Sequence, residues 1–300
     1  MLPPLIVEAA INGGTPKSRN PSVPRSVEEI AAGGCAAFEA GATVVHNHND
    51  EPNVGGAGGH SSAPYLEAWR EIRSRHPEVL LYPTMPGGNP GTTIEERNRH
   101  QVELAEAGML SMALVDPGTV NLGSASGDGP GGGDLVYQNT FGDVRHLFAF
   151  AREREIPATM SIYEPGFLAL ALAYERSGLL SRGGVVRLYF CGGGPFLGNA
   201  GFLFGLPPTK PALEAYLDML AGSRLPWMVA VPGGDVVGSG MAELAIRRGG
   251  HVRVGLEDYS GPGQPTNEEL IRQVAALAGR VGRKVASAAQ AHQILVAGTG

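Results

Sequence analysis

Short apolar segments alternate along the chain with longer segments of helical periodicity. The apolar segments are rich in β-branched residues, which is typical of buried strands. Strands that are apolar throughout, each followed by a helix, favour a parallel sheet covered on both faces. The predicted strands are Leu5–Ala10, Thr43–His48, Leu80–Pro83, Leu110–Leu114, Ala158–Ile162, Val185–Phe190, Trp227–Val231 and His251–Val254.

A helical segment follows each predicted strand, and two of the helices begin with a capping box. One box is S-V-E-E at Ser26, and the other is T-I-E-E at Thr93, whose helix ends at Gly108. The remaining helices are predicted at Pro64–Arg75, Phe141–Glu155, Gly166–Ser177, Pro211–Ala221, Gly240–Arg248 and Thr266–Gly279. A last helix, over Ala286–Val296, follows the eighth strand–helix unit.

Eight strand–helix units in 300 residues predict a closed (β/α)8 barrel, the TIM barrel. We expect one domain over residues 1–300, with the last helix as an extra C-terminal element. An open doubly wound sheet is the alternative. A dinucleotide-binding sheet of that kind requires G-x-G-x-x-G after its first strand, where this chain has I-N-G-G-T-P. The longest loops, residues 49–63, 115–139 and 191–209, all follow strands, which places them at the face where barrel active sites occur.

The composition narrows the class of protein further. Hydrophobic residues are 43% and charged residues 17% of the chain, which suits a soluble enzyme with a large core. The net charge of −6 disfavours nucleic-acid binding, although a metal or an arginine can still attract an anionic substrate into a cleft. Cys35 and Cys191 form no C-x-x-C pair, as in reduced cytoplasmic proteins. We expect neither a signal peptide nor a membrane span, because the N-terminal segment lacks a basic region and no long apolar stretch occurs.

The clearest chemical signal is the sequence His46-Asn-His48 at the end of the second predicted strand. Residues i and i+2 of a strand face the same side, so both imidazoles point into the barrel. Two imidazoles in this position supply two ligands of a metal site. A pair of hydrogen-bonded interior histidines is the alternative.

A second signal is the segment H251-V-R-V-G-L-E-D258. It places Arg253, Glu257 and Asp258 at the mouth of the same barrel. A carboxylate beside two histidines completes a three-ligand site with open positions for substrate. This donor set suits zinc, but also iron, manganese or cobalt. A helix N-cap or a solvated loop is the alternative for the acidic pair.

Two further acids occupy positions where a charge is unusual or informative. Glu8 lies late in the first predicted strand, where a carboxylate is costly unless it meets a charge or a donor. It could face the metal site, and the alternative is a partner for a buried arginine. Glu164 follows the fifth predicted strand, and its alternative is the first turn of a helix, where acids are favoured.

Polar groups at other strand ends are weaker signals. The segment Thr84–Gly88 and the hydroxyl of Ser111 suit carboxylate or phosphate binding, although ordinary turn glycines explain the former equally well. Tyr163, Tyr189 and Trp227 are predicted to pack rather than to bind ligands. The six histidines without paired spacing are interpreted as surface or structural residues.

Several motifs spread over nearly the whole chain resemble those of one family. They are H46-N-H48, E95-E-R-N-R, the region Val115–Gly123 that ends in G118-T-V-N-L-G, Y137-Q-N139, Y163-E-P-G-F and, most specific of all, G249-G-H-V-R-V-G-L-E-D258. On these motifs the chain resembles the β-keto acid cleavage enzyme family, whose founding activity is 3-keto-5-aminohexanoate cleavage. The resemblance implies a zinc-bearing TIM barrel that forms a homo-oligomer.

The same resemblance implies a reaction and residue roles. A β-keto acid and acetyl-CoA would give acetoacetate and a new acyl-CoA, by Claisen condensation and retro-Claisen cleavage. His46, His48 and Glu257 would bind the metal, and Asp258 would be the base, assisted by Arg253. Supporting catalytic or substrate-binding roles are expected for Glu8, Glu164, Thr84, Gly87, Gly88, Ser111 and Asn121.

Two other interpretations stay open at this point. The barrel could be a metal-dependent aldolase or hydrolase that acts on a keto acid without CoA. It could also be a non-catalytic binding protein that has kept the fold. The R group of the keto acid is not predicted, because loop side chains determine it.

Overall fold

Eight parallel strands form one sheet, in the order β3-β2-β1-β10-β9-β8-β7-β4. The computed structural model describes residues 2–51, 60–88, 91–123, 132, 135–196, 201 and 203–296. The strands are β1 (Val7–Ala10), β2 (Val44–Asn47), β3 (Leu80–Pro83), β4 (Ala113–Val115), β7 (Ala158–Ile162), β8 (Val185–Tyr189), β9 (Trp227–Ala230) and β10 (His251–Val254).

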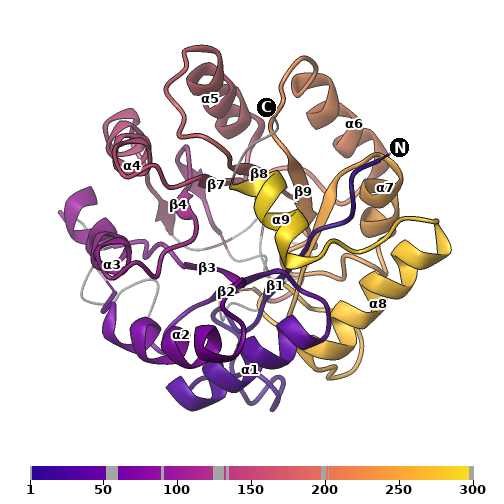
Figure 1. Ribbon diagram of the computed structural model, residues 1–300. Coiled ribbons are helices and arrows are strands. Elements are labelled where there is room, and N and C mark those ends of the chain that lie inside the picture. The colour runs from indigo at the N-terminus through magenta and orange to yellow at the C-terminus, as the bar shows by residue number, and fades with distance from the viewer. Residues whose placement is uncertain are drawn as a thin grey trace.

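The sheet closes into a barrel between β3 and β4, the two strands at the ends of that order. The backbone N–H of Ser111 donates to the carbonyl of Leu81 over 2.9 Å, and the N–H of Leu81 donates to the Ser111 hydroxyl, also over 2.9 Å. Figure 1 shows the helices arranged as an outer ring around the strands. The predicted TIM barrel is confirmed, and the open doubly wound sheet is set aside.

Helices connect successive strands and cover the outside of the barrel (Figure 1). They are α1 (Val27–Glu39), α2 (Ala63–Arg75), α3 (Ile94–Glu106), α4 (Phe141–Glu153), α5 (Pro165–Arg176), α6 (Lys210–Met219), α7 (Met241–Arg247), α8 (Asn267–Arg280) and α9 (Ala288–Leu295). Both predicted capping boxes are present, with Ser26 bonded to Glu29 and Thr93 to Glu96.

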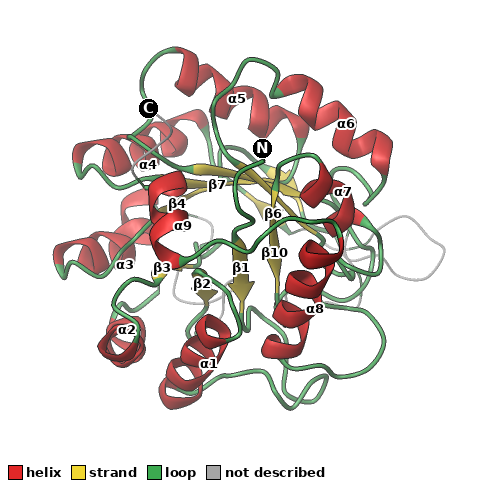
Figure 2. Cartoon of the chain, turned by 45° about the vertical axis from the view of Figure 1, so that its right-hand side comes forward, coloured by secondary structure: helices red, strands yellow, loops and turns green. Residues whose placement is uncertain are grey.

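The final helix lies across one end of the ring of strands, as Figures 1 and 2 show. The N–H of Gly184, directly before β8, donates to the carbonyl of Leu295 at the end of α9 over 2.7 Å. Helix α9 therefore covers the end where the strands begin. The opposite end, where the strands finish, is left for the loops that build the site. Among the described residues, no helix is long and apolar enough to cross a membrane.

Two local predictions differ from the structure. The fourth barrel strand begins at Ala113 rather than Leu110, because the preceding residues form the junction with β3. A short antiparallel ribbon, β5 (Val120–Asn121) with β6 (Val136–Tyr137), follows β4 and was not predicted. Two-residue strands are too short to carry a periodic signal in the sequence. Most of the glycine-rich parts of the long loops lie outside the described residues.

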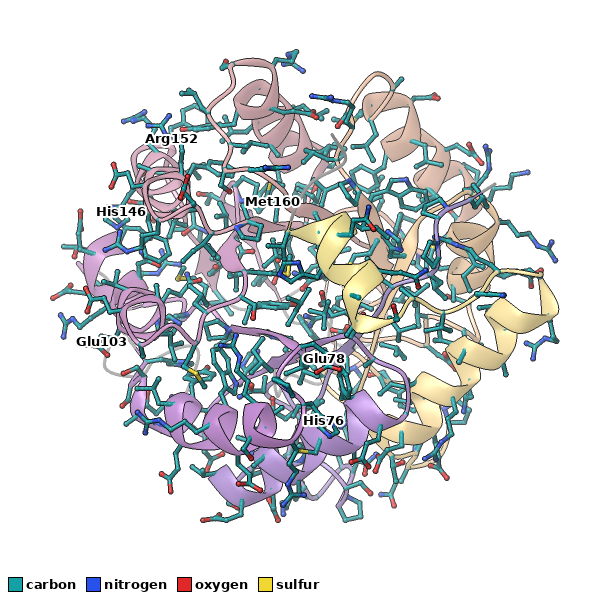
Figure 3. The ribbon with its side chains drawn as sticks, viewed as in Figure 1. His76, Glu78, Glu103, His146, Arg152 and Met160 are labelled. Atoms are coloured by element: carbon teal, nitrogen blue, oxygen red, sulfur yellow. The ribbon has the colours of Figure 1, made fainter. Side chains whose placement is uncertain are left out.

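Histidines without paired spacing lie partly on the outer helices, as predicted. Nε2 of His76 is 3.3 Å from Glu39, and Nδ1 of His146 is 3.6 Å from Glu95. Figure 3 shows the labelled His146 and Arg152 on the outside of α4, whereas Met160 lies among the strands. His60, His100 and His251 are buried instead, and none of the three belongs to the cluster formed by His46, His48 and Glu257.

Candidate metal centre and substrate pocket

Three side chains from the two ends of the sequence meet at the mouth of the barrel. His46, His48 and Glu257 each offer one ligand atom, and these atoms lie within 4.8 Å of one another. Nε2 of His46 is 3.2 Å from Oε2 of Glu257, and Nε2 of His48 is 3.4 Å from Oε1. The imidazole rings are 5.2 Å apart and nearly perpendicular, at 78°. The predicted three residues are therefore brought together.

Backbone contacts fix the orientation of both histidines. Nδ1 of His46 lies 3.3 Å from the carbonyl of Tyr82, so the opposite nitrogen faces Glu257. A neutral ring that donates through Nδ1 keeps Nε2 free as a ligand. The amide of Asn12 binds the backbone of His48 twice: it accepts from the N–H over 2.8 Å and donates to the carbonyl over 3.0 Å. Asn12 follows β1 and so ties the β2 loop to the neighbouring strand.

Glycine at position 13 gives Glu257 its place in the site. Gly13 has a φ of +54°, and a Cβ added there would lie 2.2 Å from Cγ of Glu257. The segment I-N-G-G-T-P after the first strand therefore has two functions. Asn12 holds the His48 backbone, and Gly13 leaves space for the carboxylate.

The donor set fits a divalent metal. Burial lowers the pKa of His46 to about 4, so the ring is neutral, as metal ligation requires. Burial alone would raise the pKa of Glu257, but the positive charge of Arg253 holds it well below its usual value. Oε2 of Glu257 is buried and accepts no hydrogen bond from the described residues. A bound cation would satisfy this oxygen, which faces the Nε2 of His46.

Arg253 connects this carboxylate to the rest of the site. Its guanidinium holds Asp258 at both oxygens, through Nε at 2.8 Å and Nη2 at 3.1 Å. Nη2 also lies 2.7 Å from Glu257. Both Asp258 oxygens are thus engaged by one guanidinium. Burial raises the pKa of Asp258, although Arg253 acts in the opposite direction.

Glu8 lies beneath the site and bridges two buried arginines. Its Oε1 is 3.0 Å from Nε of Arg187 and 3.3 Å from Nη1 of Arg253, and it accepts a hydrogen bond from the Tyr82 hydroxyl over 2.6 Å. Burial raises its pKa, but the two guanidiniums outweigh this, and the pKa is lowered. The alternative noted from the sequence, a partner for a buried arginine, describes these contacts.

A pocket opens beside the three candidate ligands and has two polar sides. We call the first the metal wall, formed by His46, His48, Arg253 and Glu257. We call the second the polar wall, formed by Asp116, Tyr137 and Ser161. Strand β10, which carries Arg253, and strand β4, which precedes Asp116, are four places apart in the ring of eight, so Asp116 lies across the barrel from Arg253. Strand β2, which carries His46, is two places from β4.

A family comparison agrees with this site. The model of the beta-keto acid cleavage enzyme family matches residues 4–296 of the chain. The chain belongs to this family. The resemblance found in the sequence motifs is thereby confirmed, and so is the prediction that the protein is an enzyme.

Curated relatives of this family member extend over the whole chain. One is the 3-keto-5-aminohexanoate cleavage enzyme of Fusobacterium nucleatum, 31% identical over 301 residues, with 98% of each chain covered. Another is the 3-oxoadipate:acetyl-CoA acetyltransferase of Cupriavidus necator, 31% identical over 98% of this chain and 95% of that protein. Among solved structures, ObcA in a ternary complex with a C4-CoA adduct and oxalate shares the fold. Its TM-score is 0.65 at 15% identity, over 92% of this chain and 67% of ObcA.

The structure brings only some of the predicted supporting residues of this family member to the pocket. Thr84, Gly87 and Gly88 line it. Ser111 lies at the β3–β4 junction near the opposite end of the strands, and its hydroxyl accepts from Leu81 and Arg73. Its expected pocket role came from the family resemblance, and that expectation is wrong because Ser111 lies before β4, at the end of the barrel away from the site.

Four other predicted residues also lie off the pocket surface. Asn121 is exposed on β5, and Glu164 precedes α5, where it accepts from the N–H of Gly205 over 2.8 Å. Glu8 and Asp258 do not line the pocket and contact it through arginines. For Glu164, the alternative of a residue at a helix start describes its position.

Several pocket residues were missed by the sequence reasoning. Tyr163 and Tyr189 were predicted only to pack, yet both line the pocket. Arg187 was not singled out, although a charge within the apolar run VVRLY was a signal of the same kind as Glu8. Asp116 and Tyr137 lie in segments noted for their resemblance, but no local pattern marked them as partners. Their contact spans 21 positions along the chain.

Proposed function

We propose that this enzyme cleaves a β-keto acid with acetyl-CoA, giving acetoacetate and a new acyl-CoA, and that its metal is zinc. The observation that carries the proposal is the buried group of His46, His48 and Glu257 beside Arg253, with one Glu257 oxygen lacking a donor among the described residues. The names of the relatives, which act on 3-keto-5-aminohexanoate and use acetyl-CoA with 3-oxoadipate, support it.

The proposed reaction conserves all atoms of its two substrates. Removal of a proton from C2 of the keto acid generates a carbanion that attacks the acetyl thioester, and CoA leaves as a thiolate. The thiolate then attacks the C3 ketone, the C2–C3 bond breaks, and the base returns its proton to C2. The products are acetoacetate, formed from C1, C2 and the acetyl group, and the acyl-CoA that carries the R group. A zinc ion bound by the three ligands would act as a Lewis acid toward the keto acid.

Asp258 is proposed as the base for the C2 proton, with Arg253 as its partner. A raised pKa suits a carboxylate that must accept a proton near neutral pH. Arg253 lines the pocket and holds both Asp258 oxygens, so the proton transfer requires Arg253 to release one of them when substrate binds. Arg253 also orients Glu257, and its loss would disturb both groups.

The segment Thr84–Gly88 is proposed to bind the acetyl thioester. Thr84, Met85, Gly87 and Gly88 line the pocket, and backbone N–H groups are suitable donors to an oxygen that gains negative charge. Gly88 has a φ of +76°, and a Cβ there would lie 3.0 Å from Cδ of Arg97. Glycine at this position therefore permits the tight turn that exposes the backbone to the pocket.

The test is a coupled measurement of metal content and product. Purified protein is analysed for bound metal and then assayed with a panel of β-keto acids, with and without acetyl-CoA. The proposal predicts about one zinc per chain and acetoacetate formation only when acetyl-CoA is present. Turnover without acetyl-CoA would instead support the aldolase or hydrolase alternative, and no turnover with any member would support a binding protein.

Assembly and location are also proposals. Homo-oligomer formation and a cytoplasmic location, expected from the sequence, are retained, and size-exclusion chromatography with light scattering measures the former.

A further inference from the structure

Asp116 is a buried carboxylate that lies across the pocket from Arg253, which is on β10. It follows β4, lines the pocket, and is only 4% exposed. Its Oδ2 accepts a hydrogen bond from the Tyr137 hydroxyl over 2.5 Å. Its Oδ1 is buried and has no hydrogen-bond partner within 3.5 Å among the described residues, although the Ser161 hydroxyl lies close enough to lower the pKa of the carboxyl. The proposed reaction leaves this group without a role.

The surroundings hold Asp116 in place. Its backbone carbonyl accepts from the amide of Asn139 over 3.0 Å, which links the end of β4 to the segment after β6. Arg97 lies over the Tyr137 ring at 5.5 Å and donates to the carbonyl of Gln138 over 2.8 Å. The Asp116–Tyr137 pair is therefore a fixed feature of the pocket.

The position of Asp116 relates it to a particular part of the substrate. If the carboxylate and keto oxygens of a β-keto acid lie at the metal wall, the R group on C3 extends across the barrel toward the polar wall. Substrate binding is weakened when a buried acceptor oxygen faces an apolar group. It is strengthened when the substrate donates an O–H or N–H to that oxygen. Burial also raises the pKa of Asp116, which indicates an environment that disfavours an uncompensated negative charge.

We propose that Asp116 determines the substrate specificity of the enzyme by accepting a hydrogen bond from an O–H or N–H donor on the R group. The enzyme then selects β-keto acids whose R group carries a hydroxyl or an ammonium, and it discriminates against aliphatic and carboxylate-bearing R groups. This inference rests on the proposed function, and it adds to it the chemistry of the substrate side chain.

The experiment compares four six-carbon substrates of matched length. They are 3-oxohexanoate, its 5-hydroxy derivative, its 5-amino derivative, and the diacid with a carboxylate at C6. For the wild-type enzyme, kcat/KM with acetyl-CoA is expected to be about 10- to 100-fold higher for the hydroxy or the amino compound than for 3-oxohexanoate. The diacid should be the poorest substrate, because two carboxylates would face each other.

Two variants at the same position separate the hydroxyl from the ammonium. Asp116→Asn keeps an acceptor oxygen but removes the charge, so a preference for the amino compound should collapse while a preference for the hydroxy compound should largely persist. Asp116→Ala removes both the acceptor oxygen and the charge. The kcat/KM values of the hydroxy and amino compounds should then lie within about threefold of the value for 3-oxohexanoate. Asp218→Asn, the same change on an exposed residue of α6, is the matched control and should leave the wild-type ratios unchanged.

Two results would overturn the role of Asp116. One is a wild-type enzyme that turns over 3-oxohexanoate or the diacid as well as the donor-bearing compounds, which needs no variant. The other is a preference that survives in Asp116→Ala. Calorimetric titration of the same four acids onto zinc-loaded protein without acetyl-CoA keeps the two proposals apart. A binding preference without acetoacetate formation would reject the proposed function and retain Asp116 as the specificity residue.

Discussion

The two walls of the pocket are built in different ways. The metal wall takes His46 and Arg253 from strands, where alternation fixes the direction of the side chains, and takes His48 and Glu257 from the segments directly after those strands. The polar wall takes Asp116 from the end of β4 but Tyr137 from a loop ribbon 21 residues later. The groups that would hold the part common to all β-keto acids thus lie on or directly after strands. The groups that would face the variable R group come partly from loops.

Loss of one metal ligand should have the largest effect and should affect only the metal wall. His48→Ala removes one of two imidazoles and should lower kcat at least about a thousandfold, or about 4 kcal/mol of activation free energy. Metal analysis should show loss of zinc, while far-UV circular dichroism stays unchanged. Full activity in a protein free of metal would contradict the assignment.

Glu8 joins the two walls, so its loss should weaken both. It pairs with Arg253 on the metal wall and with Arg187, which donates to the Ser161 hydroxyl over 2.9 Å. Glu8→Gln leaves two buried guanidiniums with one fewer negative charge and should lower the free energy of unfolding by about 3–5 kcal/mol. Urea denaturation measures this. Wild-type stability would show that the arginines are compensated elsewhere.

A substitution at Gly13 tests whether the position of the Glu257 side chain depends on the loop after β1. Gly13→Ala places a methyl group in contact with Cγ of Glu257 and should weaken zinc binding about 10- to 100-fold, as for other groups that orient metal ligands. Gly108→Ala is the matched control, because Gly108 also has a positive φ, +68°, and no atom within 4 Å of its added Cβ. Equal zinc affinity in the two variants would show that only backbone strain matters.

The smallest expected effect concerns pH and the loop beside the pocket. Nε2 of His100 lies 2.7 Å from the carbonyl of Thr84, and burial lowers the pKa of His100 to about 4 from the ordinary 6.5. Above pH 6.5, His100 is neutral in both the folded and the unfolded chain. Between pH 6.5 and 4 the unfolded chain takes up the proton first, so stability should fall by up to about 1.4 kcal/mol per pH unit for this group. The slope should be smaller in His100→Gln, as measured by urea denaturation at each pH, and an unchanged slope would contradict the assignment.

The sequence was sufficient to predict the barrel and the metal wall, because both depend on local patterns. Alternating apolar segments and helices define the strands, and the i, i+2 spacing of His46 and His48 defines two ligands. Glu257 needed one further step, the closure of the barrel, which places β10 beside β1 and β1 beside β2.

The remaining features depend on contacts between distant residues. Glu8 and Arg187 are 179 positions apart, and nothing local in either strand shows that the two charges neutralise each other. Ser111 was expected in the pocket from the family resemblance, but it precedes β4 and therefore lies at the opposite end of the barrel. Asp116 and Tyr137 meet only because the chain between them returns to the barrel, which no periodicity indicates.

The central claim, a zinc ion held by two imidazoles and one carboxylate, is tested most directly by X-ray absorption spectroscopy at the zinc edge of the purified protein. The account predicts nitrogen and oxygen ligands at about 2.0–2.2 Å, with the outer-shell scattering of two imidazoles, and loss of one imidazole contribution in His48→Ala. Sulfur ligands at about 2.3 Å, or a wild-type spectrum that His48→Ala leaves unchanged, would contradict it.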